Sequence, residues 1–229
     1  MEGGGLMNAD QDTVLRISPG KAEITVEQNV NGIISRKNIT PEALGECLLG
    51  SRYNDTVFDS GMLPENCVGV QLTQRTNTYF IRYPDLFADI SYYGTVYEHF
   101  PLPRLVFRFK LEKESGKVTD LRLCVVKDER LRPETPTFYY PFSNVYGDHR
   151  ICTGSNALPI YKDPARIFTL AGFILRMPNN NDMFRAGDNK LKLPYRELLE
   201  YLKDKNPSVY YSEILVSDKG TYEDFMKGR

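Results

Sequence analysis

The order of hydrophobic patterns along the chain predicts an α+β fold, an antiparallel β-meander with flanking helices. Runs in which apolar and polar residues alternate, typical of half-buried strands, dominate the sequence up to residue 127, with one helical pattern among them. Two further helical patterns follow, at 163–176 and 193–204. Because the strands precede these helices rather than alternate with them, α+β is favoured over α/β.

The composition is that of an ordinary globular protein, 41% hydrophobic and 26% charged over 229 residues, which is enough chain to bury a core. The formal net charge of −1 provides no overall positive field, so direct contact with nucleic acid or a membrane surface is not expected. No stretch approaches the roughly 20 apolar residues that span a bilayer. The first residues lack the apolar run of a secretory signal, so we expect a cytoplasmic protein with reduced thiols.

Three segments are expected along the chain. Residues 1–12 are Gly-rich and polar, which indicates a flexible tail, and 13–64 and 65–229 are expected to form an N-terminal extension and the main domain. In the extension, alternation on both sides of Pro19-Gly20, and again on both sides of Asn31-Gly32, predicts two β-hairpins.

A helix is expected directly after these hairpins. Thr40 is a suitable N-cap and Pro41 a suitable first helical residue. Leu44, Cys47 and Leu48 then share one helical face, so we expect Cys47 to be a buried core thiol.

The main domain begins with two predicted strand pairs. Residues 68–74 and 78–84 form the first pair, and 104–112 and 118–127 flank a polar turn that contains Gly116. Cys124 lies among apolar residues of the last run and is expected to be packed in the sheet.

Helices and a final strand are predicted beyond residue 160. Asp163 and Pro164 begin the pattern at 163–176, and Tyr195, Leu198, Leu199 and Leu202 lie on one side of the pattern at 193–204. The intervening 177–190 is a loop by composition, and 208–229 could add a strand and a short terminal helix.

The segment 139–156, YYPFSNVYGDHRICTGSN, carries the candidate chemistry. Cys152 is followed by the small residues Thr153, Gly154 and Ser155, which leave room for a substrate. Asn144 offers an amide donor for an oxyanion, and His149 could favour the thiolate electrostatically. The competing interpretation is a buried structural cysteine. A Cys/His zinc site is not expected, because the four cysteines are widely spaced and there are only two histidines.

The same residues resemble the active-site motif of ubiquitin-conjugating enzymes. That family carries His-Pro-Asn followed by Val-Tyr, a turn with Gly, and a Cys eight positions after the Asn. In FSNVYGDHRIC, Asn144, Val145, Tyr146 and Cys152 stand at the matching positions. The proline-rich lead-in, the upstream meander and the helix after the cysteine are similar to the family as well.

The sequence resembles the bacterial branch called prokaryotic family D more closely. Its pattern is matched here by Arg132-Pro133, Thr135-Pro136, Tyr140-Pro141, Asn144-Val145 and Cys152-Thr153-Gly154, and the likeness covers about 65–185. That branch includes the B protein of the PRTRC cassette, which occurs with ThiF-type adenylating proteins on mobile elements.

The resemblance implies a ubiquitin-conjugating-enzyme-like core, with 65–229 as the catalytic domain. It implies that Cys152 carries a ubiquitin-like protein as a thioester and that Asn144 stabilises the oxyanion when an amine accepts the acyl group. A carboxylate near the amine would assist; Asp148 is the nearest in sequence, and Asp182 and Asp188 are alternatives. The implied partners are a ThiF-type adenylating protein and the ubiquitin-like protein. No cofactor is implied, because the ATP chemistry belongs to the adenylating partner.

Two departures leave rival functions open. Phe142 and Ser143 replace the His and Pro of the family motif, and His149 is the one histidine near the site. One alternative is therefore an inactive binding or scaffold module, since such variants of the fold lack the motif histidine. Another is a cysteine hydrolase, which the sequence favours less because no His–carboxylate pair is evident.

Overall fold

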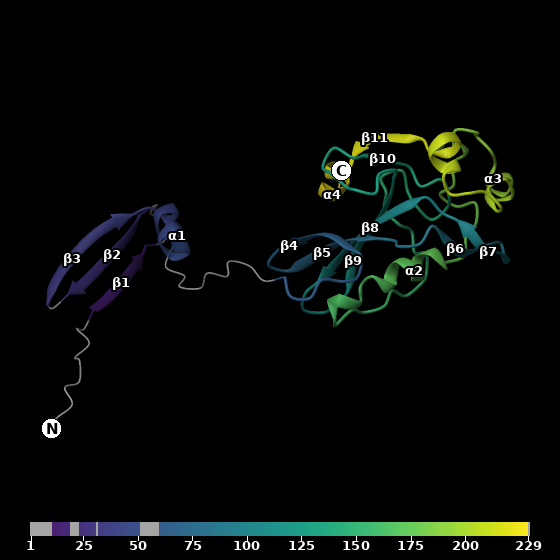
Figure 1. Cartoon of the computed structure of the whole chain (residues 1–229). Helices are drawn as coiled ribbons and strands as arrows, with labels where there is room; N and C mark the ends of the chain where they lie inside the picture. Colours follow the sequence, from purple (N-terminus) through teal and green to yellow (C-terminus); the bar gives the residue numbers. More distant parts are fainter. Residues whose placement is uncertain (1–10, 19–22, 31, 51–59, 229) are drawn as a thin grey trace, which may run out of the picture. The chain divides into compact units, whose positions relative to one another are not determined.

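The computed structural model describes residues 11–18, 23–30, 32–50 and 60–228, and the chain divides into two compact units, 1–60 and 61–229 (Figure 1). The expected tail up to residue 10, the Pro19-Gly20 turn and Asn31 lie outside the described residues. None of the described helices is both long and apolar enough to cross a membrane.

The first unit is a three-stranded antiparallel sheet with one helix. Strands β1 (Gln11–Ile17), β2 (Ile24–Val30) and β3 (Ile33–Ile39) pair in sequence order, which confirms the expected strand pairing. Helix α1 (Pro41–Gly50) begins as predicted, because the Ala43 amide donates to the Thr40 hydroxyl at 3.2 Å.

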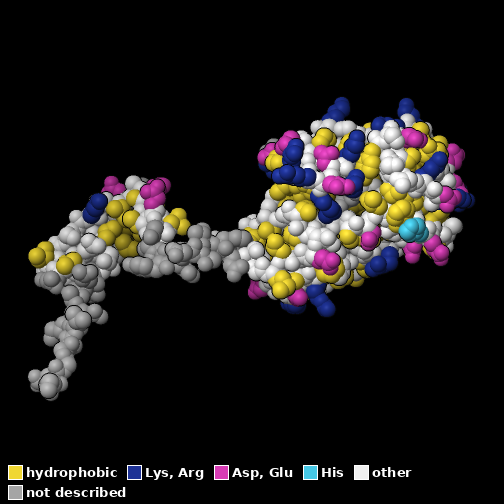
Figure 2. All heavy atoms as spheres, viewed as in Figure 1, with side chains coloured by type: hydrophobic (Ala, Val, Ile, Leu, Met, Phe, Trp, Pro, Cys, Tyr) yellow, Lys and Arg dark blue, Asp and Glu magenta, His cyan; other side chains and the backbone are white. Residues whose placement is uncertain are grey.

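The prediction that Cys47 is buried is wrong. Residues 43–45 of α1 are half-buried, whereas Cys47, Leu48 and Leu49 are exposed. Apolar side chains of the strands are exposed too, and Figure 2 shows such side chains on the surface of this unit. The helical spacing was interpreted correctly, but a unit this small does not cover the whole length of its helix.

The second unit is built on a six-stranded sheet in which every pairing is antiparallel. Its spatial order is β11-β10-β9-β8-β5-β4. The strands are β4 (Cys67–Leu72), β5 (Thr76–Arg82), β8 (Arg104–Glu112), β9 (Val118–Val126), β10 (Pro136–Phe138) and β11 (Ser217–Thr221). The two strand pairs predicted from the sequence, β4 with β5 and β8 with β9, are confirmed.

A hairpin that the sequence analysis did not predict is inserted between β5 and β8. It consists of β6 (Phe87–Tyr92) and β7 (Thr95–Pro101), which form a separate two-stranded sheet. Tyr93 and Gly94 turn the chain with φ angles of 46° and 83°, the left-handed conformation that two-residue hairpin turns require.

Helices cover both faces of the large sheet (Figure 1). They are α2 (Thr169–Leu175) after the 3₁₀ turn η1 (Pro164–Arg166), the 3₁₀ turn η2 (Ala186–Asp188), α3 (Tyr195–Leu202), the π-helical turn η3 (Tyr210–Ile214) and α4 (Tyr222–Lys227). Asp163 accepts from the Ala165 amide at 3.0 Å, as its predicted capping role requires. The apolar residues predicted for α3 are buried in one core with β8, β9 and the apolar side chains of α2.

Helix α4 covers the opposite face of the sheet. Its Tyr222 and Phe225 pack on a second apolar cluster that includes Phe80, Val106 and Cys124. Cys124 is fully buried there, as predicted. The chain is therefore α+β, with an antiparallel sheet between two groups of helices.

Replacing the anchor of α4 tests this second core. Phe225 is 2% exposed, so we expect Phe225→Ala to lower the free energy of unfolding by about 3–5 kcal/mol through lost burial and the cavity it leaves. Cys124 beneath it should also react faster with a thiol reagent. Met62→Ala, at an 86% exposed side chain, is the control and should change neither quantity in denaturant titration and alkylation. Unchanged stability in Phe225→Ala would contradict this packing.

Candidate active site

An antiparallel arm places Asn144 opposite Cys152. The Cys152 amide donates to the Asn144 carbonyl at 2.8 Å, and the Tyr146 amide donates to the Arg150 carbonyl at the same distance. The eight-residue spacing in the sequence thus corresponds to two directly paired positions. Asn144 adopts a φ of 65°, a left-handed conformation that Asn tolerates better than most residues.

The arm is held on the outer edge of β9. The Leu123 amide donates to the His149 carbonyl and the Ile151 amide donates to the Leu121 carbonyl, both at 2.9 Å. Val145 and Ile151 are buried beneath it. The candidate nucleophile therefore stands on an element that is hydrogen-bonded to the central sheet. One isolated bridge, Val145 with Ile151, lies within the arm, and another joins Arg150 to Arg122 of β9.

Cys152 lies in an open groove of about 280 Å³. One wall continues from Cys152 through 153–156, and the opposite wall comes from the loop 177–183. Asn144 and Asp182 also line this groove. Cys152 is half-buried, so its thiol is accessible and is not a core group.

The side chain of Asn144 bridges the two walls. Its amide nitrogen donates to the Pro178 carbonyl at 3.1 Å. An amide nitrogen carries two hydrogens, so this contact leaves the second one for a group bound in the groove.

Tyr146 contacts the thiol from the arm. Its hydrogen bond with Cys152 raises the pKa of the Tyr146 phenol. The Arg150 guanidinium lies over the Tyr146 ring, 5.4 Å from its centroid. Tyr146 is thus held between the Cys152 thiol and the Arg150 guanidinium.

The family model of prokaryotic E2 family D matches residues 54–168, half of the chain, including Asn144 and Cys152. The chain belongs to prokaryotic E2 family D. No curated protein and no solved structure gives a significant match. The matched range ends before the loop 177–183 that forms the second wall of the groove.

In this member of family D, the residues that replace the motif His and Pro are buried. Phe142 is 3% exposed and packs its ring against Phe100, Tyr140, Tyr195 and Tyr210. Ser143 is fully buried and donates to Asn179 at 2.8 Å. The chain on the N-terminal side of Asn144 is therefore fixed by packing and by a hydrogen bond.

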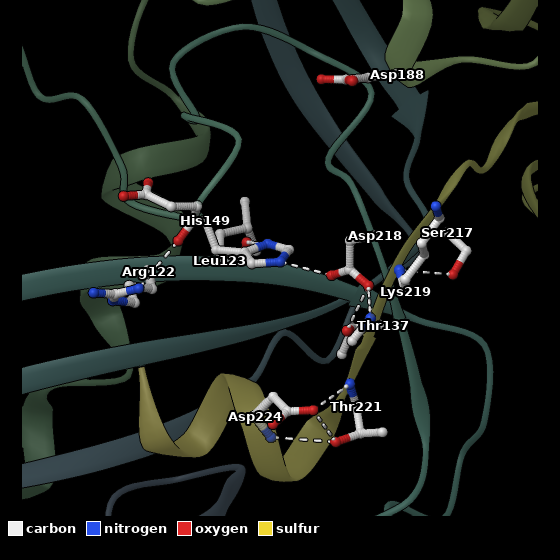
Figure 3. Close-up of polar contacts among 12 residues, drawn as sticks. Arg122, Leu123, Thr137, His149, Asp188, Ser217, Asp218, Lys219, Thr221 and Asp224 are labelled. Atoms are coloured by element: carbon white, nitrogen blue, oxygen red, sulfur yellow. Dashed lines mark hydrogen bonds and ion pairs between the residues drawn. The ribbon is translucent and has the colours of Figure 1, made fainter. Parts of the chain in front are cut away.

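His149 does not line the groove, and its side chain points toward Asp218 of the C-terminal strand β11 (Figure 3). Its Nε2 lies 2.7 Å from Asp218 and its Nδ1 lies 3.1 Å from the Leu123 carbonyl. A His–carboxylate pair thus exists, although the sequence did not reveal it. Both ring nitrogens are engaged by acceptors, so His149 has no nitrogen left to act as a base toward Cys152.

The three carboxylates considered from the sequence lie in different places. Asp148 is paired with Arg150 at 2.7 Å, and it lines a second pocket of about 380 Å³ with His149 and Asp218. Burial raises the pKa of Asp148, but its hydrogen bonds from Arg150 outweigh this and lower it. Asp188 is paired with Arg185 at 2.7 Å. Asp182 is the one that lines the groove of Cys152.

The far wall of the groove was not foreseen in the sequence. Its Asn180 donates to the Asp182 carboxylate at 2.9 Å and accepts from the Asp182 amide at 2.7 Å, which orients that carboxylate. The run PNNND at 178–182 was interpreted only as a loop. Three consecutive asparagines before an acid are the signal that could have indicated a hydrogen-bonded loop. The described residues hold no group of three or more potential metal ligands.

The His149–Asp218 contact predicts a pH-dependent stability. Burial raises the pKa of Asp218, but donors from His149, Gly220 and Thr137 outweigh it, so the folded pKa lies below the ordinary value. The stabilisation is therefore present above the unfolded pKa of about 3.9 and is lost as the pH falls through the folded pKa.

We expect Asp218→Asn to lower the free energy of unfolding at pH 7 by about 3 kcal/mol, because it leaves a buried partner uncompensated. The difference from the wild type should shrink below about pH 4 in denaturant titrations. Asp204→Asn, at an exposed aspartate, is the control and should show no such change. A difference that stays constant from pH 7 to pH 3 contradicts the prediction.

Proposed function

We propose that the second unit is a ubiquitin-conjugating-like transferase that carries a ubiquitin-like protein as a thioester on Cys152. The observation that supports this most is the shared groove of Cys152 and Asn144, which stand opposite each other on one arm. Family membership supports an E2-like role. A ThiF-type adenylating protein would supply the activated acyl group, in a bacterial mobile-element cassette of the PRTRC type.

In the first step, the Cys152 thiolate attacks the C-terminal carbonyl of the ubiquitin-like protein. The new S–C bond replaces the bond to the partner's thiol, which leaves as thiolate. One thioester replaces another, so the step needs a thiolate and space but no external base. The Tyr146 hydroxyl contacts Cys152 and can donate a hydrogen bond to the sulfur during this exchange.

In the second step, an amine attacks the same carbonyl and forms a tetrahedral oxyanion. The free hydrogen of the Asn144 amide stabilises this charge. The C–S bond then breaks, the Cys152 thiolate leaves, and the amine loses its extra proton. Asp182 is the carboxylate of the groove that can accept a hydrogen bond from the incoming amine.

The second candidate function is a binding module without transfer chemistry. The observation that favours it is Phe142, which fills the position of the motif histidine and belongs to the aromatic core. A module of this kind would bind the ubiquitin-like protein without forming a covalent bond at Cys152.

The transferase proposal predicts a thiol-sensitive adduct. Incubation with the cognate adenylating protein, the ubiquitin-like protein and ATP should give a thioester that Cys152→Ala lacks, as read by non-reducing gels and mass spectrometry. Cys47→Ala, at an exposed thiol of the first unit, is the matched control and should charge normally. Asn144→Gly removes the amide without strain at its positive φ, so charging should persist while transfer to lysine slows by about 10²–10³. A wild-type protein that never charges would leave the binding module as the function.

Matched substitutions distinguish the roles of Asp182 and Asp148 in the transfer step. Asp182→Asn should slow transfer of the acyl group to lysine by on the order of 10², because the amine loses its acceptor in the groove. Asp148→Asn should leave transfer unchanged, because Asp148 pairs with Arg150 and does not line the groove. Single-turnover discharge of the charged protein at several lysine concentrations measures both. The assignment fails if Asp148→Asn is the slower variant.

A further inference from the structure

The direction of the Asn144 amide depends on the opposite wall of the groove. Asn144 ends one strand of the arm, and its side chain is tied to the Pro178 carbonyl at 3.1 Å. Pro178 belongs to a loop that is not part of the arm or of the large sheet. The position of that carbonyl therefore decides where the remaining amide hydrogen points.

Asn179 holds this loop to the inserted hairpin. Its amide donates to the Ser91 carbonyl at 2.8 Å, and its side-chain nitrogen donates to the same carbonyl at 3.1 Å. Its own carbonyl accepts from the Tyr93 amide at 3.1 Å. Asn179 is 7% exposed, so these bonds form in a setting where losing one is costly.

Ser143 ties the same asparagine to the residue before Asn144. Its fully buried hydroxyl donates to Asn179 Oδ1 at 2.8 Å and lies 3.4 Å from the Tyr195 hydroxyl. Two side-chain bonds thus run in parallel between residues 143–144 and residues 178–179.

The orientation of the Asn179 amide is determined by these partners. Its nitrogen faces the Ser91 carbonyl, which can only accept, and its oxygen faces the Ser143 hydroxyl, which can donate. A flipped amide would place oxygen against oxygen at Ser91.

We propose that Ser143 and Asn179 are positioning residues that aim the Asn144 amide into the groove. Through Asn179, the inserted β6–β7 hairpin supports the wall of the groove, although none of residues 87–101 lines the groove itself. The catalytic consequence rests on the proposed function, because Asn144 acts on the oxyanion of the transfer step. The structural consequence, a fixed Asn144 amide, does not rest on it.

The test separates loading of Cys152 from transfer. The probe is a glycylglycine thioester of mercaptoethanesulfonate, which exchanges onto the Cys152 thiolate with release of mercaptoethanesulfonate; L-lysine then accepts the acyl group. Ser143→Ala and Asn179→Ala should load at the wild-type rate but transfer to lysine about 10²-fold more slowly, since small misplacements of a catalytic group cost about this much. Ser143→Thr keeps the hydroxyl and should recover most of the transfer rate.

Thr135→Ala is the matched control. Thr135 is 3% exposed and its hydroxyl accepts from the Arg132 amide at 2.9 Å, so the variant loses a buried hydroxyl away from the groove. Its transfer rate should equal that of the wild type even where its melting temperature falls as far as that of Ser143→Ala. Equal slowing of loading and transfer in Ser143→Ala, or equal slowing in Thr135→Ala, overturns the proposal.

A second readout is independent of acyl transfer. The side-chain amide protons of Asn144, followed by NMR in nitrogen-labelled protein, should exchange slowly in the wild type and faster in Ser143→Ala. If the wild type does not load at Cys152, the proposed function fails and this exchange measurement alone decides the positioning role. Unchanged exchange in Ser143→Ala overturns it.

Discussion

The outer edge of β9 is the constraint on which the candidate site depends. Strand β10 pairs with the last part of this edge, at Val125 and Val126, and the arm takes the part around Leu121 and Leu123. The chain leaves β10 at Phe138 and must return to the same edge within about a dozen residues, which the proline-rich stretch and the tight arm achieve. The hydrogen bonds of β9 therefore position the Asn144–Cys152 pair, and burial of Val145 and Ile151 holds it there.

Local patterns predicted the meander and the capped helices, because alternation and caps are properties of short segments. The contacts that orient the side chains of the candidate site join residues far apart in the sequence, so no local pattern predicts them. His149 meets Asp218 across 69 residues, and Ser143 meets Asn179 across 36.

The β6–β7 hairpin was missed for a different reason: its turn, Tyr93-Gly94, lacks the usual Asn-Gly signal, although both residues adopt positive φ. Cys47 was predicted to be buried because it lies on the apolar face of a helix. Periodicity identifies such a face but does not show whether another part of the protein covers it.

Phe142, which replaces the motif histidine, and His149 are both buried and contribute to packing of the domain. Phe142 joins a cluster of rings from β7, α3 and η3. His149 joins the arm to β11, between the rings of Tyr139 and Phe225. Its two ring nitrogens contact the Leu123 carbonyl and the Asp218 carboxylate, so the side chain is held on both sides. The polar groups to which the proposed transfer assigns roles are Asn144 and Asp182, which line the groove, and Tyr146, which contacts the thiol.

This set of groups suits thioester exchange and aminolysis better than hydrolysis. Exchange of one thioester for another requires a thiolate and an oxyanion donor, but no strong base. A carboxylate, with an ordinary pKa of about 3.9, is a weak base toward a lysine ammonium at about 10.4 and a far weaker one toward water, whose pKa is higher still. An amine also becomes a nucleophile by losing one proton to solvent, whereas water needs a base in place at the moment of attack. The residues that line the groove include no histidine, and His149 is fully engaged on the other side of the arm. A hydrolase would need a base that the described residues lining the groove do not supply, whereas the proposed transfer needs no strong base.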